Sequence, residues 1–365
     1  MTRARRFADG AVEFLVPACL IVLVGVVGGF MAPGTEEDFI AALVAVTIVI
    51  ALHVFVGNSG VLSFGHISFV ALGAFAAGLM TIPATVKPTL MPELFPFLAE
   101  HDVGNIPSLV LAAALGGLFA ALVGIPLMRL SGLAAGIATL AVLEITHNVL
   151  RFWEKIGPGA KTLSLVPETT GLFQATVGAL IAAAAAIAFR SSPPGRKLRA
   201  SREDPPAAQA VGINIHRQRL LAFTISGALA GFAGGLMVHQ LGSITTEQVY
   251  LDLTFLTLAM LVIGGASSLW GAVVGALLVS FLDSFLLNAE NGTNVVVAEL
   301  TLPNGSSIVI LGVLLALMLI LRPGGITGGR EASLPFLRAA LAAPPPPPGA
   351  GRAQDERPER TVLDV

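Results

Sequence analysis

Residues 38–56 read DFIAALVAVTIVIALHVFV, and this stretch decides the fold class. After Asp38 it contains no Asp, Glu, Lys or Arg, and its length is that of an α-helix crossing the hydrocarbon core of a bilayer, about 20 residues. The whole chain is composed in the same way, because 55% of its 365 residues are apolar and only 12% are charged. A soluble domain carries roughly 25% charged residues. We therefore expect an all-α polytopic membrane protein.

The composition also excludes other classes of protein. A net charge of −2 does not provide the basic surface that binds nucleic acid. Cys19 is the only cysteine, which excludes a disulfide-stapled secreted domain. The apolar stretch 11–31 is longer than the core of a cleaved signal, roughly 7–15 residues, so we interpret it as the first transmembrane helix.

Apolar stretches separated by Pro, Gly and charged clusters predict about ten transmembrane helices. The eighth and ninth stretches share the break Gly-Gly-Ala-Ser-Ser at 264–268. This region, 253–287, fits either a tight helical hairpin or a broken helix with a re-entrant segment, which is tolerated only where protein or a cavity surrounds it. The ten stretches are 11–31, 38–56, 61–82, 106–128, 132–152, 171–189, 219–241, 253–267, 270–287 and 305–321.

Basic residues near the ends of the spans predict the orientation. Three arginines among the first six residues place the N-terminus in the cytoplasm, and ten spans place the loop 190–219, with seven Lys and Arg, on the same side. Arg151, Lys155 and Lys161 fall outside, against the rule. We expect a multi-pass protein of the bacterial inner (plasma) membrane with both termini in the cytoplasm.

Two parts of different composition are expected. Residues 1–329 form one membrane domain, whose longest polar segment between two spans is the loop 190–219. Residues 330–365 contain the polyproline run 344–348 and many charged residues, but little apolar surface. Such a segment cannot offset the entropy lost on ordering, so we predict a disordered cytoplasmic tail.

The loop 190–219 contains a predicted short helix. Asp204 is a good N-cap, the proline after it suits the first helical position, and Gly212 suits the left-handed residue that ends a helix. About two turns are too few to be stable alone. We expect this helix either to lie on the bilayer surface as a connector or to dock onto a cytoplasmic partner through its small side chains.

Two motifs in this sequence resemble one known family. Residues 202–214, REDPPAAQAVGIN, are similar to the EAA-type coupling loop of ABC importer permeases in its branched-chain amino-acid form, R-E-D-x-x-A-A-x-A-x-G-I-N. Residues 57–66, GNSGVLSFGH, are similar to that family's G-x-x-G-x-L-S-x-G-H. Weaker similarities follow at 137–144, 264–271 and 321–325. The chain most resembles the LivM-type subunits of the family.

The resemblance implies a permease subunit of an ATP-binding cassette importer that carries branched-chain amino acids (leucine, isoleucine, valine) across the inner membrane. It implies four kinds of partner besides the lipid bilayer: a second, LivH-like permease, two ATP-binding subunits, a periplasmic substrate-binding protein and the amino-acid substrate. Because the partner subunits hydrolyse ATP, this chain is expected to be no enzyme. Residues 156–162 depart from the family's T-G-G-x-x-G-L, so urea, amides or another small polar cargo are alternatives. An ion-coupled secondary carrier is the alternative from another class.

Two groups of site residues follow. The resemblance implies ATPase-coupling residues in the loop, namely Arg202, Glu203, Asp204, Ala207, Ala208, Gly212 and Asn214. Broken helices line the routes of transporters, and an ionisable group within a span faces the bundle interior or a pathway. The candidate route residues are therefore Asn58, Ser59, Ser63, His66 and Glu144, with structural roles in helix packing and pairing as the alternative.

No catalytic, metal-binding or cofactor-binding residue is predicted. Glu144 and His147 lie one helical turn apart, but the sequence has no H-E-x-x-H, no G-x-S-x-G and no phosphate loop. The run of small residues 227–235 predicts a close approach of two helices.

Overall fold

The computed structural model describes residues 3–290, 303, 305–322 and 324–331. The chain divides into two units, and the larger, Glu13–Ala332, is the subject below. The other comprises Met1–Val12 and Ser333–Val365, of which residues 3–12 are described and helical. The predicted tail, 330–365, lies outside the described residues except for Arg330 and Glu331.

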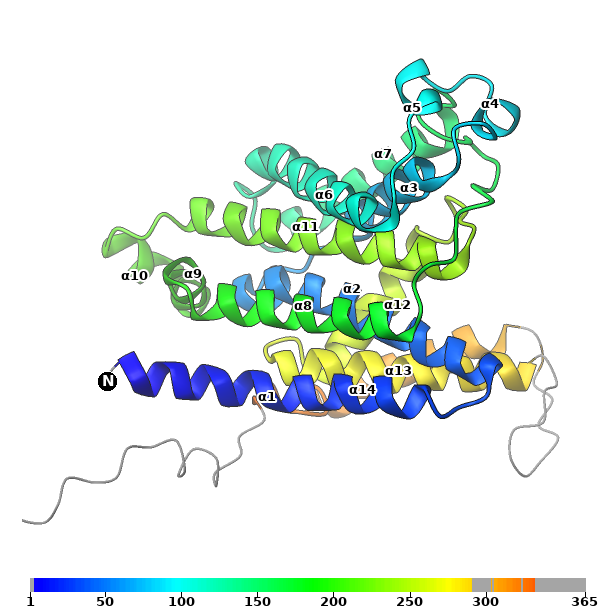
Figure 1. Cartoon of the computed structure of the whole chain (residues 1–365). Coiled ribbons are helices and arrows are strands. Elements are labelled where there is room, and N and C mark those ends of the chain that lie inside the picture. Colours follow the sequence, from blue (N-terminus) through cyan, green and yellow to red (C-terminus); the bar gives the residue numbers. More distant parts are fainter. Residues whose placement is uncertain (1–2, 291–302, 304, 323, 332–365) are drawn as a thin grey trace, which may run out of the picture. The chain divides into compact units, whose positions relative to one another are not determined.

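The regular structure of the described residues is helical, which confirms the predicted all-α fold. Figure 1 shows most of the long helices of the larger unit running side by side. The helices are α1 (Arg3–Gly28), α2 (Pro33–Ser59), α3 (Ile67–Thr81), α4 (Lys87–Leu90), α5 (Pro96–Glu100), α6 (Asn105–Leu127), α7 (Gly132–Phe152), α8 (Leu172–Ser191), α9 (Pro193–Glu203), α10 (Pro205–Ala210), α11 (Ile215–Leu241), α12 (Leu251–Gly264), α13 (Leu269–Glu290) and α14 (Ser306–Leu321).

Apolar helices lie at all ten predicted spans. Six of them, α2, α6, α7, α8, α11 and α13, are by length and composition able to cross a membrane. Shorter apolar helices occupy Glu13–Gly28, Ile67–Thr81, Leu251–Gly264 and Ser306–Met318. The third span differs most from its prediction, because α3 begins at Ile67 and not at residue 61.

The region 253–287 forms a helical hairpin. Helices α12 and α13 pack against each other and are joined by 265–268, where Gly265 has φ of +119°. Close packing needs glycines on both helices: a β-carbon on Gly275 would overlap the carbonyl oxygen of Met260, and one on Gly264 that of Gly271. Of these two helices, α13 has the length and composition to cross a membrane, and α12 is a shorter apolar helix.

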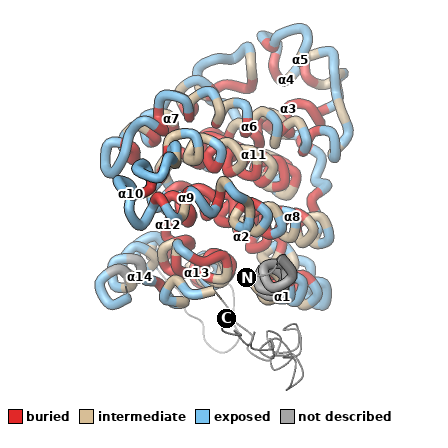
Figure 2. Tube along the Cα trace, turned by 90° about the vertical axis from the view of Figure 1, so that its left-hand side faces the viewer, coloured by how far each residue is buried: buried red, intermediate tan, exposed pale blue. Residues whose placement is uncertain are grey.

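Two helices form the centre of the larger unit. From Ile40 to Ser59, α2 is buried on nearly every side, which agrees with its continuous apolar sequence. Helix α11 packs against α2, α3 and α6, and Figure 2 shows buried residues following α2 and α11. Glycines allow this approach, because a β-carbon on Gly234 would overlap the carbonyl oxygen of Val70, and one on Gly231 that of Ala112. The predicted close packing of 227–235 is confirmed.

Between α3 and α6 the chain leaves the bundle as a compact segment that holds α4 and α5. The side chain of Lys87 is fully buried there, and its Nζ donates to the carbonyl oxygens of Leu98, at 2.9 Å, and of His101. Burial lowers the pKa of Lys87, while the nearby carboxylate of Asp102 opposes that shift. The lysine thus ties the two short helices together.

Candidate functional site

The loop between α8 and α11 contains the short helix α10, bounded as the sequence indicates. The Asp204 side chain accepts a hydrogen bond from the backbone N–H of Ala207 at 3.0 Å. Gly212 has φ of +80°, and its N–H donates to the carbonyl oxygen of Gln209 at 2.9 Å. Within the helix only Ala208 is buried. The other residues of α10, two prolines, two alanines and Gln209, are exposed.

Helix α9 precedes α10 and attaches it to the spans. Ser192 caps α9 by accepting a hydrogen bond from the N–H of Gly195 at 3.3 Å. The narrow buried face of α9 consists of Gly195, Leu198 and Ser201, and α9 packs against α2, α8 and α11. Because α10 in turn packs on α9, a displacement of α10 would act on three spanning helices through α9.

Arg202, in the last turn of α9, joins the two sequence motifs. Its Nη1 donates to the carbonyl oxygen of Gly57 at 2.8 Å, in the last turn of α2. A cation is favoured there, because the free carbonyl groups give the C-terminal end of a helix a partial negative charge. The stem of Arg202 also passes Gly60, where a β-carbon would lie 3.0 Å from its Cγ.

Residues 60–66 interrupt the helical path between α2 and α3. Gly60 ends α2 with φ of +70°, and α3 resumes at Ile67. Helix α7 supports the interruption, since the N–H of Phe64 donates to Oγ1 of Thr139 at 3.1 Å. A β-carbon on Gly65 would overlap the Thr139 carbonyl oxygen. The helical path is thus interrupted at 60–66, one of the two interpretations of the 57–66 motif, and the interruption contacts α9 on one side and α7 on the other.

Four of the five predicted route residues lie at this interruption, Asn58 and Ser59 in the last turn of α2 and Ser63 and His66 within it, and all four are buried. Their exposed fractions are 3% for Asn58, 4% for Ser59, 1% for Ser63 and 2% for His66. Asn58 donates to the Val54 carbonyl oxygen at 2.9 Å. The Nε2 atom of His66 lies 3.1 Å from Oγ of Ser226 on α11. Asn58 is thus bonded within α2 and His66 contacts α11, whereas the buried Ser63 Oγ and His66 Nδ1 have no hydrogen-bond partner among the described residues.

The fifth predicted route residue, Glu144, lies apart from the other four and is exposed on α7. Asn148 donates to its Oε1 at 2.7 Å, and the Tyr250 hydroxyl donates to its Oε2. The bond to the carboxylate raises the pKa of the Tyr250 hydroxyl above its ordinary value. Sequence reasoning singled out Glu144 but not Tyr250, which precedes α12 in a loop.

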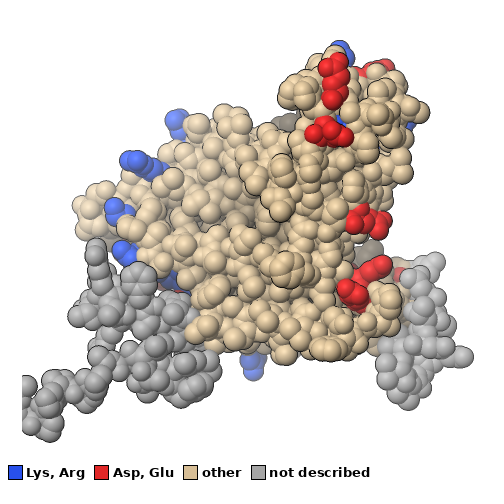
Figure 3. Space-filling model, in the orientation of Figure 1, with Lys and Arg blue, Asp and Glu red and all other residues tan. Residues whose placement is uncertain are grey.

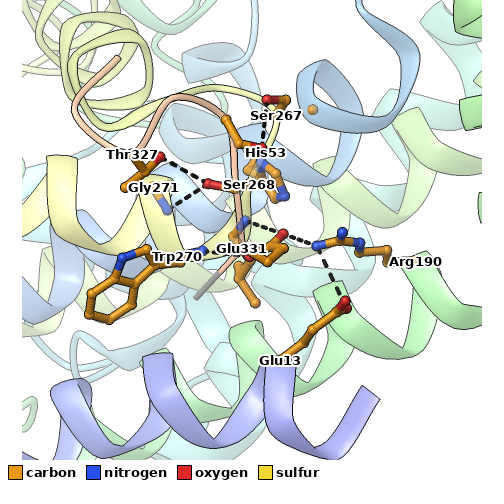
Figure 4. A network of polar contacts seen from close by, with 12 residues as sticks. Glu13, His53, Arg190, Ser267, Ser268, Trp270, Gly271, Thr327 and Glu331 are labelled. Carbon is orange, nitrogen blue, oxygen red and sulfur yellow. Dashed lines mark hydrogen bonds and ion pairs between the residues drawn. The ribbon is translucent and has the colours of Figure 1, made fainter. Parts of the chain in front are cut away.

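A second polar network fastens the α12–α13 hairpin near the end of α2 (Figure 4). Glu331 accepts hydrogen bonds from the backbone N–H groups of Leu269, at 2.9 Å, and Trp270, at 3.2 Å, at the start of α13. Arg190, at the end of α8, forms ion pairs with Glu331 and with Glu13 of α1. His53 of α2 lies with Nδ1 3.0 Å from the Ala266 carbonyl oxygen. The hairpin, α1, α2 and α8 are thus connected at one end of the bundle.

The two ends of the bundle differ in charge. Figure 3 shows most of the visible Lys and Arg side chains of this face at the end with α9 and α10, and the Asp and Glu side chains at the other end together with a few basic ones. Arg151 lies at the acidic end, and Glu247 neutralises it through a contact of 2.7 Å. This pairing accounts for a basic residue on the side where the sequence rule did not expect one.

Sequence reasoning missed α9 and the role of Glu331. A signal for α9 was present, because serine followed by two prolines, at 192–194, is typical of a helix start. For Glu331 no signal was available. Its partners, Leu269 and Arg190, are distant in sequence, and only the fold brings the three together.

Comparison with known families gives one match over most of the chain. The model of the family described as branched-chain amino acid transport system / permease component matches residues 38–319. The high-affinity branched-chain amino acid transport system permease protein LivM of Escherichia coli (strain K12) is 27% identical over 362 residues, covering 90% of this chain and 76% of that protein.

Of two other similar proteins, one is named for a different cargo. The guanosine ABC transporter permease protein NupQ of Bacillus subtilis (strain 168) is 28% identical over 253 residues, 63% of this chain and 79% of that protein. The probable branched-chain amino acid transport permease protein LivH of Methanocaldococcus jannaschii is 32% identical over 139 residues, 37% of this chain and 40% of that protein. No solved structure matches the chain at a significant level.

Proposed function

The chain belongs to the family of permease components of branched-chain amino acid transport systems, and from this premise we propose that it imports leucine, isoleucine and valine as one permease of an ABC importer. Its similarity to the LivM permease of Escherichia coli along 90% of the chain supports this cargo. A LivH-like permease, two ATP-binding subunits and a periplasmic binding protein are the partners that this function requires. Because the partners hydrolyse ATP, this chain transmits energy without being an enzyme.

The observation that carries the mechanism is the exposed helix α10 with its two capped ends. We assign it the contact with an ATP-binding subunit, in which Arg202, Glu203, Asp204, Ala207, Ala208, Gly212 and Asn214 form or support the docking surface. ATP binding closes the ATPase dimer and displaces α10, and Arg202 carries the displacement to Gly57 at the end of α2. Such a shift requires that the ATPase contacts differ between the outward- and inward-facing states.

The charge of the two ends supports an orientation. We place the basic end, with α9 and α10, in the cytoplasm and the acidic end, with α4 and α5, in the periplasm, because positive charge near span ends marks the cytoplasmic side. Both termini are then cytoplasmic in the inner membrane. The interruption at 57–66 lies near the cytoplasmic ends of the spans, where we place a gate of the translocation route.

Cysteine labelling tests this orientation. Gln209→Cys and Thr89→Cys, both at exposed positions, are expected to react with a membrane-impermeant maleimide from opposite sides, Thr89→Cys in intact spheroplasts and Gln209→Cys only in inverted vesicles. Each is made with Cys19→Ser, which removes the only native thiol. Lys87 is unsuitable because it is buried. Labelling of both positions in intact spheroplasts would contradict the orientation.

The cargo is tested by deleting the gene for this chain. Uptake of leucine, isoleucine and valine at low concentration is expected to fall at least tenfold and to return when the wild-type gene is supplied. Urea and guanosine uptake are the controls. Normal uptake of the three amino acids with loss of urea or guanosine uptake would contradict the cargo and keep the transporter class, whereas uptake that follows an ion gradient without ATP would contradict the class.

A further inference from the structure

The exposed stripe of α7 changes from apolar to polar along the helix. Its first half presents Leu133, Ile137 and Leu140, with exposed fractions of 78%, 60% and 38%. One and two turns further on, the same stripe presents Glu144 and then Asn148 and Arg151. A carboxylate in a spanning helix is costly against lipid, so this half of the stripe faces a polar route, water at the end of the span or another protein.

The loop between α11 and α12 completes this polar half and orders it. Tyr250 donates its hydroxyl hydrogen to Glu144 and stacks on the ring of His147, with centroids 4.0 Å apart. Glu247 accepts a hydrogen bond from Arg151 at 2.7 Å. We name the six residues involved the α7 polar face: Glu144, His147, Asn148, Arg151, Glu247 and Tyr250.

The α7 polar face has unused capacity for both charges of an amino acid. A carboxylate has about four acceptor positions, and the contacts of Glu144 with Asn148 and Tyr250 leave some of them open. A guanidinium has five N–H donors, and the Glu247 contact of Arg151 uses one of them. Both side chains are at least partly exposed, so a solute can reach them.

Glu144 and Arg151 place opposite charges along one helix. The two residues lie seven positions apart, a backbone rise of about 10 Å at 1.5 Å per residue. Both side chains are long, and an amino-acid head group lying between them can form one charge-assisted hydrogen bond with each, about 2.8 Å in length. The polar face carries two carboxylates, Glu144 and Glu247, and one guanidinium, Arg151. Its net negative charge favours the binding of an ammonium group over the binding of a further carboxylate without one.

We propose that the α7 polar face binds the head group of an α-amino acid in transit, with Glu144 accepting from its ammonium and Arg151 donating to its carboxylate. Tyr250 and Asn148 hold the Glu144 carboxylate in place. The site recognises the α-ammonium and α-carboxylate groups that leucine, isoleucine and valine share. It disfavours a cargo without these two groups. This inference rests on the proposed cargo and adds the residues that recognise it in the membrane.

The test uses the complete importer, reconstituted in liposomes with saturating leucine-loaded binding protein. Glu144→Gln and Arg151→Gln are each expected to lower the maximal rate of leucine uptake at least tenfold. The leucine concentration for half-maximal uptake, measured in a separate series below saturation, the yield of assembled complex and the ATP hydrolysis without leucine are expected to stay unchanged. Glu144→Asp should recover part of the rate, and Glu93→Gln, an exposed carboxylate in the segment with α4 and α5, should have no effect.

A second readout separates contact with the substrate from a structural role. Asn148→Cys, made with Cys19→Ser, keeps both Glu144 and Arg151 and is expected to react with a small hydrophilic thiol reagent more slowly in the presence of leucine. The same concentration of 4-methylpentanoate, which lacks the ammonium group, should give no protection. A structural carboxylate would give the same reaction rate with and without leucine.

Three outcomes overturn the inference. Full leucine uptake by both Glu144→Gln and Arg151→Gln, with normal uptake by the wild type, contradicts the head-group site and leaves the proposed cargo standing. Loss of the partner permease from purified Glu144→Gln complexes contradicts it in favour of an interface between permeases. A wild-type complex that takes up no amino acid contradicts the proposed cargo and this inference with it.

Discussion

Replacing Gly234 by alanine is expected to remove most of the folded permease from the membrane. The new methyl group would overlap the carbonyl oxygen of Val70 and would lie 2.9 Å from the backbone nitrogen of Ala74. Both atoms belong to the backbone of α3, so no side-chain rotation can relieve the overlap, and α3 and α11 must separate. Overpacking in a dense core typically costs about 1–3 kcal/mol, and occasionally more. Because backbone atoms are involved here, we expect the upper end of that range or beyond.

Gly312→Ala is the matched control, because Gly312 is helical and a β-carbon there has no neighbour within 4 Å among the described residues. Both substitutions raise helix propensity by the same amount, roughly 0.5–1 kcal/mol. They therefore differ in steric overlap alone. The measurement is the monodisperse fraction of detergent-solubilised complex against temperature. Equal melting of Gly234→Ala and wild type would contradict the close approach of α3 and α11.

Local signals in the sequence account for much of the fold. The apolar run 38–56 predicts the buried helix α2, because a helix that is apolar all round has no face to present to water. Asp204 and Gly212 predict the ends of α10, because N-caps and left-handed glycines act within one turn of the chain. The run 227–235 predicts close packing without naming the partner helix.

Long-range contacts account for what could not be predicted. The sequence contains Arg202 and Gly57 in separate motifs, and nothing local indicates that the side chain of one binds the carbonyl oxygen of the other. The exposure of Glu144 and the burial of His66 likewise depend on which way each helix turns in the bundle. Both residues were candidates for one route, and the structure places them apart.

Replacing Gly212 by valine is expected to abolish coupled transport while leaving the permease folded. Gly212 has φ of +80°, and a β-branched residue is strongly disfavoured there. A β-carbon at this position has no neighbour within 4 Å among the described residues, so the effect is on backbone conformation and not on packing. The last turn of α10 should therefore unwind. Asp204→Ala should act more mildly, since loss of an N-cap costs about 0.5–2 kcal/mol.

Gly212→Asn is the control for this substitution, because asparagine adopts the left-handed conformation more readily than other residues with a side chain. We expect Gly212→Asn to keep most of the wild-type transport. All the variants should insert normally and assemble with the partner permease. An assembly defect shared by Gly212→Val and Gly212→Asn would mean that the side chain itself is not tolerated and that helix unwinding is not the cause.

The central claim is that α10 receives the movement of the ATP-binding subunit, and ATP hydrolysis by the reconstituted importer tests it most directly. Substrate-stimulated hydrolysis and leucine uptake are measured together for wild type, Asp204→Ala, Gly212→Asn and Gly212→Val. We predict that both activities fall together, least in Gly212→Asn, further in Asp204→Ala and by more than tenfold in Gly212→Val. Full stimulated hydrolysis and full uptake by Gly212→Val would show that α10 is a passive connector.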